Sequence, residues 1–217
     1  MVQAVAAARA RKGGPIRVAV VGLGTGTISC YMAPGDDWTY YEVDPAVVRI
    51  ARDPSRFTFL SACAPDVPIV LGDARITLRE APDASFDLIL IDAFSSDTIP
   101  VHLITREAMA GYVDKLAPEG IVAMHISNRY MELTTVVAGI AEANGLIARA
   151  NFAEDGTDYD AYRYSSQVVV AARAAADFGA LADEEKWIQV RPHPGQRTWT
   201  DDYSNIVGAI LRQMRQQ

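Results

Sequence analysis

Carboxylates that follow apolar runs are the residues of this 217-residue sequence best placed to do chemistry. Asp92 comes directly after Phe86–Ile91 (FDLILI), and a carboxylate at the end of a buried strand is partly desolvated. Such a group can accept a proton from an amine nucleophile, so we interpret Asp92 as a general base. Asp97 follows in the same segment and can anchor a second positive charge. The alternative is that Asp92 caps a turn and Asp97 belongs to a polar loop.

A glycine-rich segment, Val20–Thr27 (VVGLGTGT), follows the first apolar run. Its glycines remove side chains where the chain must turn sharply, and they let a ligand touch the backbone. The spacing is GxGxG and not the GxGxxG of dinucleotide sites, which disfavours NAD. Ordinary glycine turns are the alternative explanation. The residues expected to contact a nucleotide-like ligand here are Gly22, Gly24, Thr25 and Gly26.

Two further motifs stand at the ends of later apolar runs. Glu42 lies 20 positions after Gly22, where a carboxylate can accept hydrogen bonds from both ribose hydroxyls. Asp73 and Ala74 can meet an adenine edge, and Asp44 is placed in the same binding set. The alternatives are a solvated strand end for Glu42 and a helix N-cap for Asp73. Because open α/β sheets bind ligands at the carboxyl ends of their strands, the joint occurrence predicts an adenosine-containing ligand.

Short apolar runs and helical stretches alternate to position these residues. The runs expected as parallel strands are Ile16–Val21, Trp38–Val43, Ile69–Leu71, Phe86–Ile91 and Ile121–Ile126. The expected helices are Pro45–Arg52, Ile76–Glu80, Arg106–Leu116 and Met131–Asn144, with Asp44, Thr105 and Asn128 as N-caps of the first, third and fourth.

Two later runs, Leu146–Asn151 and Ser166–Ala171, have no helix between them and must therefore pair antiparallel. The whole pattern predicts an α/β, Rossmann-like class I methyltransferase fold. We expect a mostly parallel seven-stranded sheet that ends in an antiparallel strand pair, with helices on both faces. We expect residues 1–217 to form one nucleoside-binding domain, with residues 1–15 as an N-terminal extension.

Composition and charge exclude several functions. Twenty basic residues against 27 acidic ones give a net charge of −7, which disfavours nucleic acid as a partner. No apolar run approaches the roughly 20 residues that cross a bilayer, so we expect no membrane insertion of this chain.

The cysteines and histidines point to no redox or metal chemistry. Cys30 and Cys63 form no CxxC pair, which favours a reducing, cytoplasmic location. The three histidines have no metal-site spacing, so no metal is expected. We interpret His102 and His125, near strand ends, as structural side chains.

Five segments together resemble the spermidine synthase (polyamine aminopropyltransferase) family, most closely a divergent bacterial branch often fused to membrane-spanning segments. They are GLGTGT at 22–27, YYEVDPAVV at 40–48, GDAR at 72–75, IDAFSSDTIPVHLITREAM at 91–109 and WTDDYSN at 199–205. The resemblance covers about residues 16 to 211 and implies the same fold. It implies that Glu42 binds ribose, Asp73 adenine and Asp97 the amine substrate, with Asp92 as catalytic base.

The sequence departs from the family at three points. Thr25 stands where the family carries an Asp that helps hold the aminopropyl amine. The family's N-terminal β-hairpin domain has no counterpart in the residues before the first strand. Four residues separate Asp92 from Asp97, where the family's D-x-x-D stretch has two.

The resemblance implies transfer of an aminopropyl group from decarboxylated S-adenosylmethionine to a polyamine or other small amine, without a metal. An S-adenosylmethionine-dependent methyltransferase is the first alternative, favoured by Thr25. A non-catalytic module that binds a nucleoside or polyamine is the second. A homodimer is the assembly to test. Two further segments are candidates for substrate contacts. Asp201, Asp202 and Tyr203 can line the substrate cleft, or they merely lead into a C-terminal helix capped by Ser204 or Asn205. The acidic, tyrosine-rich loop 154–164 suits a polyamine.

Overall fold

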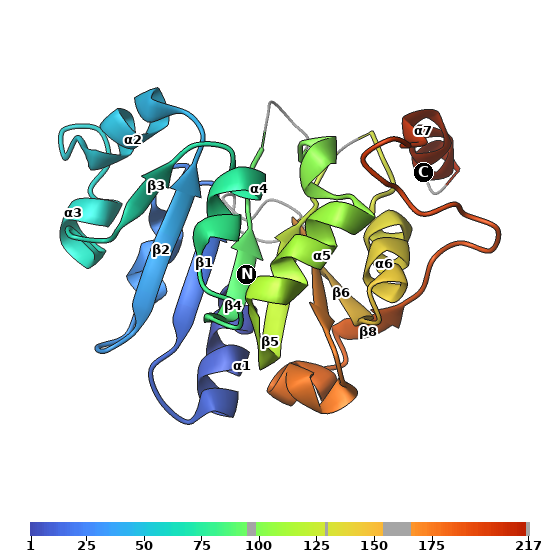
Figure 1. Cartoon of the computed structure of the whole chain (residues 1–217), viewed down its shortest axis with the longest axis horizontal. Coiled ribbons are helices and arrows are strands. Elements are labelled where there is room, and N and C mark those ends of the chain that lie inside the picture. The colour runs from blue at the N-terminus through green and yellow to red at the C-terminus, as the bar shows by residue number, and fades with distance from the viewer. Residues whose placement is uncertain (95–98, 129, 154–165, 216–217) are drawn as a thin grey trace, which may run out of the picture.

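One central sheet organises the computed structural model, which describes residues 1–94, 99–128, 130–153 and 166–215 (Figure 1). The strand order is β3-β2-β1-β4-β5-β7-β6-β8. The β3-to-β5 side is parallel, and the pairs β5–β7, β7–β6 and β6–β8 are antiparallel. The strands are β1 Arg17–Val21, β2 Asp37–Glu42, β3 Ile69–Leu71, β4 Phe86–Ile91, β5 Leu116–His125, β6 Ile147–Ala153, β7 Ser166–Ala172 and β8 Trp187–Val190.

The predicted fold class is confirmed, but the sheet has eight strands within the described residues and not seven. The additional strand, β8, pairs antiparallel with β6 at the edge of the sheet. It has only four residues; Trp187 is buried and Ile188 is half exposed. Such a short, one-sided strand lacks the continuous apolar run by which the buried strands are recognised in the sequence.

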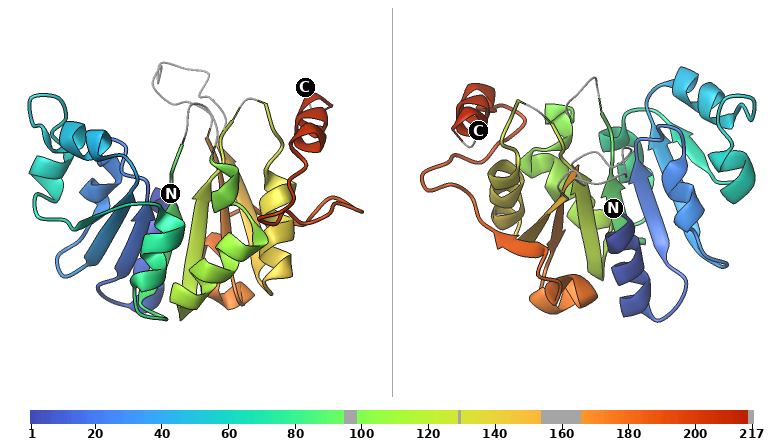
Figure 2. Two further views of the ribbon diagram at one scale, coloured as in Figure 1. Left: turned by 45° about the horizontal axis from the view of Figure 1, so that its top comes forward. Right: turned by 180° about the vertical axis from the view of Figure 1, so that it is seen from behind.

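Helices cover both faces of the sheet, as the views in Figure 2 show. No helix in the described part of the chain is long and apolar enough to cross a bilayer. The helices and 3₁₀ turns are α1 Val2–Lys12, η1 Thr27–Tyr31, α2 Pro45–Arg52, α3 Phe59–Cys63, α4 Ala74–Thr77, η2 Leu78–Glu80, η3 Val101–Leu103, α5 Arg106–Lys115, α6 Thr134–Ala143, η4 Ala175–Ala182 and α7 Ile206–Met214.

Alternate residues of the central strands supply two separate cores. In β1, Val18 and Val20 pack with α1, α3 and η4, whereas Ala19 and Val21 face α4, α5 and α6. This follows from the period of two in a strand, since successive side chains point to opposite faces. Every residue of β4 is buried, which its mainly apolar run predicts, and the buried Asp87 is paired with Lys12 and Arg17.

The N-caps decide where the helices begin. Asp44 and Thr105 cap α2 and α5 as predicted, each accepting a backbone N–H through its side chain. The assignment of Asn128 as the cap of α6 is wrong. Its side chain accepts the backbone N–H groups of Tyr130 and Met131 and closes a turn before that helix. Asx turns of this kind compete with helix capping for the same side-chain oxygen.

Helix α1 was not expected from the sequence. Its buried face consists of small residues, three alanines and Val5, which give little amphipathic signal. Ion pairs hold the helix in place, among them Lys12 with Asp87 in β4 and Arg9 with Asp36 just before β2. Burial alone would raise the pKa of Asp87, but hydrogen bonds from Arg17 and Lys12 lower it to about 2.

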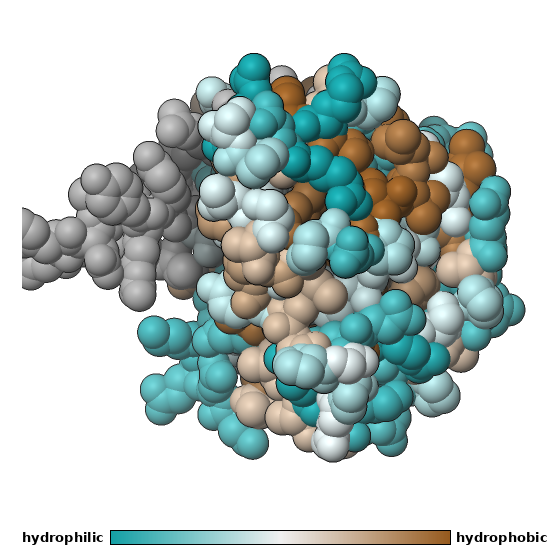
Figure 3. All heavy atoms as spheres, turned by 90° about the vertical axis from the view of Figure 1, so that its left-hand side faces the viewer, coloured by the Kyte–Doolittle hydropathy of each residue, from teal (hydrophilic) through white to brown (hydrophobic). Residues whose placement is uncertain are grey.

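The β3 edge of the sheet faces the viewer in Figure 3, where apolar side chains gather on part of the surface between hydrophilic ones. Leu71 in β3 and Ile76 in α4 are 53% and 64% exposed. The strand itself is only three residues long. A short edge strand limits the pairing of exposed backbone with another chain.

Cys30 and Cys63 form a disulfide that joins η1 to the end of α3, with Cα atoms 4.9 Å apart. This bond was not anticipated from the sequence, in which the two cysteines form no CxxC pair. The two residues are 33 positions apart in sequence, so their proximity depends on how α3 folds back onto η1. The argument for a reducing compartment from cysteine usage loses its basis.

Candidate active site

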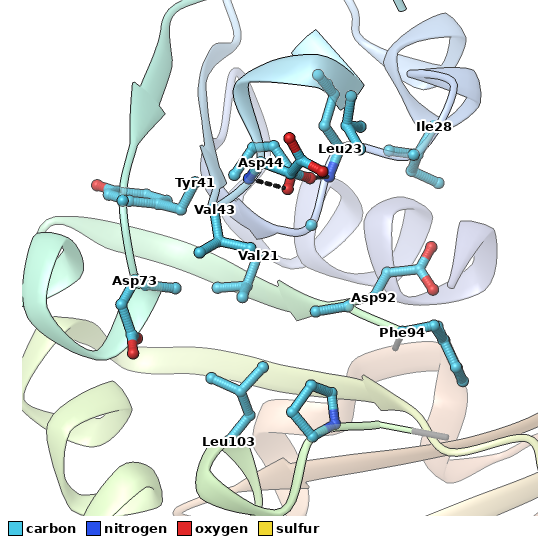
Figure 4. Close-up of a pocket in the computed structure, with 18 of the residues that line it drawn as sticks. Val21, Leu23, Ile28, Tyr41, Val43, Asp44, Asp73, Asp92, Phe94 and Leu103 are labelled. Atoms are coloured by element: carbon cyan, nitrogen blue, oxygen red, sulfur yellow. Dashed lines mark hydrogen bonds between the residues drawn. The ribbon is translucent and has the colours of Figure 1, made fainter. Parts of the chain in front are cut away.

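A cleft of about 660 Å³ opens at the carboxyl ends of β1, β2, β3 and β4 (Figure 4). This is the edge where open α/β sheets bind ligands. The structure brings together at this cleft most of the residues selected from the sequence: Gly22, Gly24, Thr25, Glu42, Asp44, Asp73, Ala74 and Asp92. Segments far apart in the chain meet here because the parallel strands all end on the same side.

Glu42, at the end of β2, is only 7% exposed, so the alternative of a solvated strand-end residue is wrong. Its Oε2 accepts the backbone N–H of Leu23 at 2.8 Å, and its Oε1 accepts that of Asp44 at 2.9 Å. Each carboxylate oxygen keeps a second lone pair for another donor. Glu42 is therefore an acceptor fixed in place by the backbone on both sides.

The three glycines of the glycine-rich segment have different roles. A Cβ at Gly22 would lie 2.5 Å from the carbonyl oxygen of Asp92, so this glycine lets the β1 turn pack against the end of β4. A Cβ at Gly26 would lie 2.6 Å from the side chain of Leu60 in α3, and Gly26 does not line the cleft. At Gly24, with φ +52°, the space around a Cβ is open. A ligand can therefore approach the backbone closely at Gly24.

Asp73 and Asp44 are both helix caps on the cleft wall. Oδ1 of Asp73 accepts the backbone N–H of Arg75 at 2.8 Å and starts α4, two residues earlier than the sequence predicted. Asp73 is therefore a helix N-cap, as the alternative interpretation of the sequence held. Its Oδ2 lies 3.9 Å from Nε2 of His102 on the facing wall. Oδ1 of Asp44 accepts the N–H of Ala46 at 2.7 Å.

Asp92 follows β4 and faces a histidine that sequence reasoning did not connect to it. Its Oδ1 lies 2.8 Å from Nδ1 of His125, and its side chain is 40% exposed. In the parallel β4–β5 register, Ile91 pairs with Met124, so the next residue of each strand end is adjacent. Asp92 follows β4 and His125 is the last residue of β5, so the sequence places both at strand ends, but only the β4–β5 register in the structure pairs them.

The C-terminal trio, which consists of Asp201, Asp202 and Tyr203, is not among the described residues that line the cleft. Asp201 pairs with Arg75 through both carboxylate oxygens at 2.6 and 2.9 Å and accepts a hydrogen bond from Thr105. These hydrogen bonds from Arg75 hold the pKa of Asp201 below its ordinary value. Tyr203 packs under the guanidinium of Arg197, and Asp202 is exposed. The predicted substrate roles of the trio stay predictions.

Asp97 and the loop 154–164 lie outside the described residues. The apolar part of the cleft wall was also not selected from the sequence, since single apolar residues after strands carry no distinctive signal. Figure 4 shows that it comes from several elements. Its members are Val21, Leu23, Ile28, Tyr41, Val43, Val47, Phe94 and Leu103.

No family model matches the sequence. Two curated proteins do: the polyamine aminopropyltransferase of Vibrio vulnificus, 31% identical over 113 residues, and the N-terminal histidine N-methyltransferase of Emericella nidulans, 30% identical over 111 residues. The matches cover 50% and 49% of this chain. They span only 36% and 19% of those proteins, so this chain corresponds to a minor part of either.

Solved structures match over a greater length. A probable spermidine synthase from Corynebacterium glutamicum superposes with a TM-score of 0.64 at 18% identity, covering 94% of this chain and 81% of that chain. A spermidine synthase solved with the transition state analogue AdoDATO gives 0.54 at 17% identity, covering 94% and 69%. Fold and cleft thus define a protein of the class I methyltransferase fold. The Vibrio match adds a similarity in sequence to a polyamine aminopropyltransferase over half of this chain.

Proposed function

We propose that this protein transfers an aminopropyl group from decarboxylated S-adenosylmethionine to an amine. Three features of the cleft fit the adenosyl part of such a donor. Glu42 offers fixed acceptors for ribose hydroxyls, and the backbone at Gly24 is open to close approach. Val43, Val47 and Leu103 supply apolar surface for a base. A spermidine synthase of the same fold holds a transition state analogue, which supports this assignment.

The charge of the cleft wall is the observation that favours decarboxylated over intact S-adenosylmethionine as the donor. Among the described lining residues none is a lysine or arginine, and four are carboxylates: Glu42, Asp44, Asp73 and Asp92. The sulfonium and the amine of the decarboxylated donor are both cationic and gain from this field. The intact donor adds a carboxylate, which the same field repels. The balance therefore favours aminopropyl over methyl transfer.

Asp92 acts as the general base in this reaction. The acceptor arrives as an ammonium and gives one proton to Oδ2 of Asp92, while the aromatic ring of Phe94 beside it favours a bound cation. The amine nitrogen then attacks the carbon next to the sulfonium. The C–S bond breaks, its electron pair stays on sulfur, and neutral methylthioadenosine leaves. The product is a secondary ammonium, and alignment of nucleophile and leaving group supplies most of the remaining acceleration.

Methyl transfer from intact S-adenosylmethionine is the second candidate. Thr25 and Thr27 place two hydroxyls, 2.7 Å apart, at the glycine segment where an acidic residue would favour an amine. Hydroxyl groups can donate to a carboxylate. The match to the Emericella methyltransferase is consistent with this alternative.

One assay separates these functions. The purified protein is incubated with decarboxylated or intact S-adenosylmethionine and a panel of amines, and products are detected by mass. We expect an acceptor heavier by one aminopropyl group, with methylthioadenosine released, from the decarboxylated donor only. A methylated acceptor would support the second candidate. Binding of donor without any product, in the presence of the full panel, would indicate a non-catalytic module.

Replacing Glu42 by Gln should weaken binding of methylthioadenosine. An amide offers one acceptor where the carboxylate offers two, so the N–H of Leu23 or of Asp44 would face an NH₂ group. Hydrogen bonds to a charged group contribute about 1.5–3 kcal/mol, which corresponds to roughly a 10- to 100-fold loss of affinity by titration calorimetry. The exposed Glu80→Gln is the matched control and should bind like the parent protein. Equal affinities for both variants would remove Glu42 from the ribose site.

A further inference from the structure

Asp92 is the first member of a hydrogen-bonded chain that leads away from the cleft. Its Oδ1 meets Nδ1 of His125 at 2.8 Å, and Nε2 of His125 lies 2.7 Å from Oγ of Ser127. The backbone N–H of Gln167 in β7 donates to the same Oγ, also at 2.7 Å. These hydrogen bonds thus connect the end of β4, across β5, to the backbone of β7.

The donors and acceptors along this series of hydrogen bonds can be assigned, because the role of the group at each end is fixed. The N–H of Gln167 can only donate, so Ser127 accepts there and can turn its own hydroxyl hydrogen toward Nε2 of His125. At the other end, the ionised carboxylate of Asp92 can only accept, so Nδ1 of His125 must carry a hydrogen. The network itself therefore assigns neutral His125 the Nδ1–H tautomer.

The imidazole is also held by packing. The ring of Phe94 meets it edge-on, with ring centroids 4.7 Å apart and an interplanar angle of 67°. The side chain of His125 is 27% exposed, compared with 40% for that of Asp92. Among the described residues, hydrogen bonds engage Oδ1 of Asp92 and leave Oδ2 free.

We propose that His125 is a positioning residue for Asp92. By donating to Oδ1 it fixes the carboxylate so that Oδ2 is the oxygen offered to the ammonium of the acceptor in the cleft. Ser127 acts one step further away by holding the imidazole in the tautomer that donates. This inference rests on the proposed base role of Asp92. A carboxylate free to rotate would lose alignment, and a misplacement of about 1 Å can cost roughly 100-fold in rate.

The same connectivity of Ser, His and Asp occurs in hydrolases, where serine is the nucleophile. Two observations argue against that role here. Oγ of Ser127 already accepts the amide of Gln167, and Ser127 is not among the described residues that line the cleft. Asp92, at the opposite end of this series of hydrogen bonds, does line the cleft. The reacting end is therefore the carboxylate.

Kinetics of His125 variants test the proposal. His125→Ala should lower kcat about 10- to 100-fold while KM for the donor changes less than about twofold, since alignment of the base and not donor binding is lost. His125→Asn keeps an N–H near the position of Nδ1 and should recover most of the rate. In the Asp92→Asn background, His125→Ala should cause no further loss, because its effect passes through Asp92. His193→Ala, at an exposed histidine, is the matched control.

Equal losses from His125→Ala in both backgrounds, or no recovery with Asn, would overturn the positioning role. A second readout does not require turnover: the ¹⁵N spectrum of the histidine side chains in the parent protein. We expect a protonated Nδ1 at His125, and a spectrum with hydrogen on Nε2 alone would overturn the assignment. If no donor reacts, the proposed function fails, while this spectrum still decides whether His125 donates to Asp92.

Discussion

Asp92→Asn should reduce turnover to a level near background while donor affinity stays almost unchanged. Asparagine has the size of aspartate, and its oxygen can still accept from Nδ1 of His125, so the local structure is preserved. It cannot accept the proton of the ammonium. General-base catalysis contributes about 10²- to 10⁴-fold, so kcat should fall by that amount. Single-turnover mass detection with the decarboxylated donor measures the rate, and calorimetry measures its binding.

A conservative change elsewhere provides the control. Asp66 is exposed and lies outside the cleft, so Asp66→Asn should match the parent protein in both measurements. Turnover of Asp92→Asn at the parental rate would exclude Asp92 as the base. A large loss of donor affinity would instead assign Asp92 to binding, which is its role in the non-catalytic alternative.

Loss of the Cys30–Cys63 disulfide should lower thermal stability more than an ordinary surface substitution. The bond closes a loop of 33 residues, and in the chain-entropy treatment such a closure is worth about 3–4 kcal/mol. For a protein of this size each kcal/mol corresponds to roughly 2–4 °C, so Tm should fall by about 6–16 °C on reduction. Differential scanning fluorimetry with and without reductant measures the shift.

The double variant Cys30→Ser/Cys63→Ser controls for other effects of the reductant. It should melt at the lower temperature and show no response to reductant. An unchanged Tm of the reduced parent protein, or two free thiols by mass in protein purified without reductant, would contradict the bond. Since the disulfide joins η1 to α3, and Leu60 of α3 abuts Gly26, the glycine-rich segment should also loosen on reduction.

The order of strands and helices follows from local patterns, so most of the fold was predictable. The parallel strands appear as short runs rich in apolar residues, and the caps Asp44 and Thr105 mark helix starts by chemistry contained within a few residues. The failures lie where local signals are weak or ambiguous. The alanine-rich α1 and the four-residue β8 bury little patterned apolar surface. Asn128 has two local uses for one side-chain oxygen, and the chain adopts the turn.

The candidate site divides in the same way. The sequence alone determined which carboxylates and glycines follow strand ends, because that position depends only on the neighbouring residues, and parallel strands then bring them to one edge. Tertiary structure decided how each is held. The hydrogen bond from Leu23 to Glu42, the pairing of Asp201 with Arg75, the disulfide and the contact of Asp92 with His125 all join residues distant along the chain. Such contacts depend on strand register and helix packing, which no local pattern encodes.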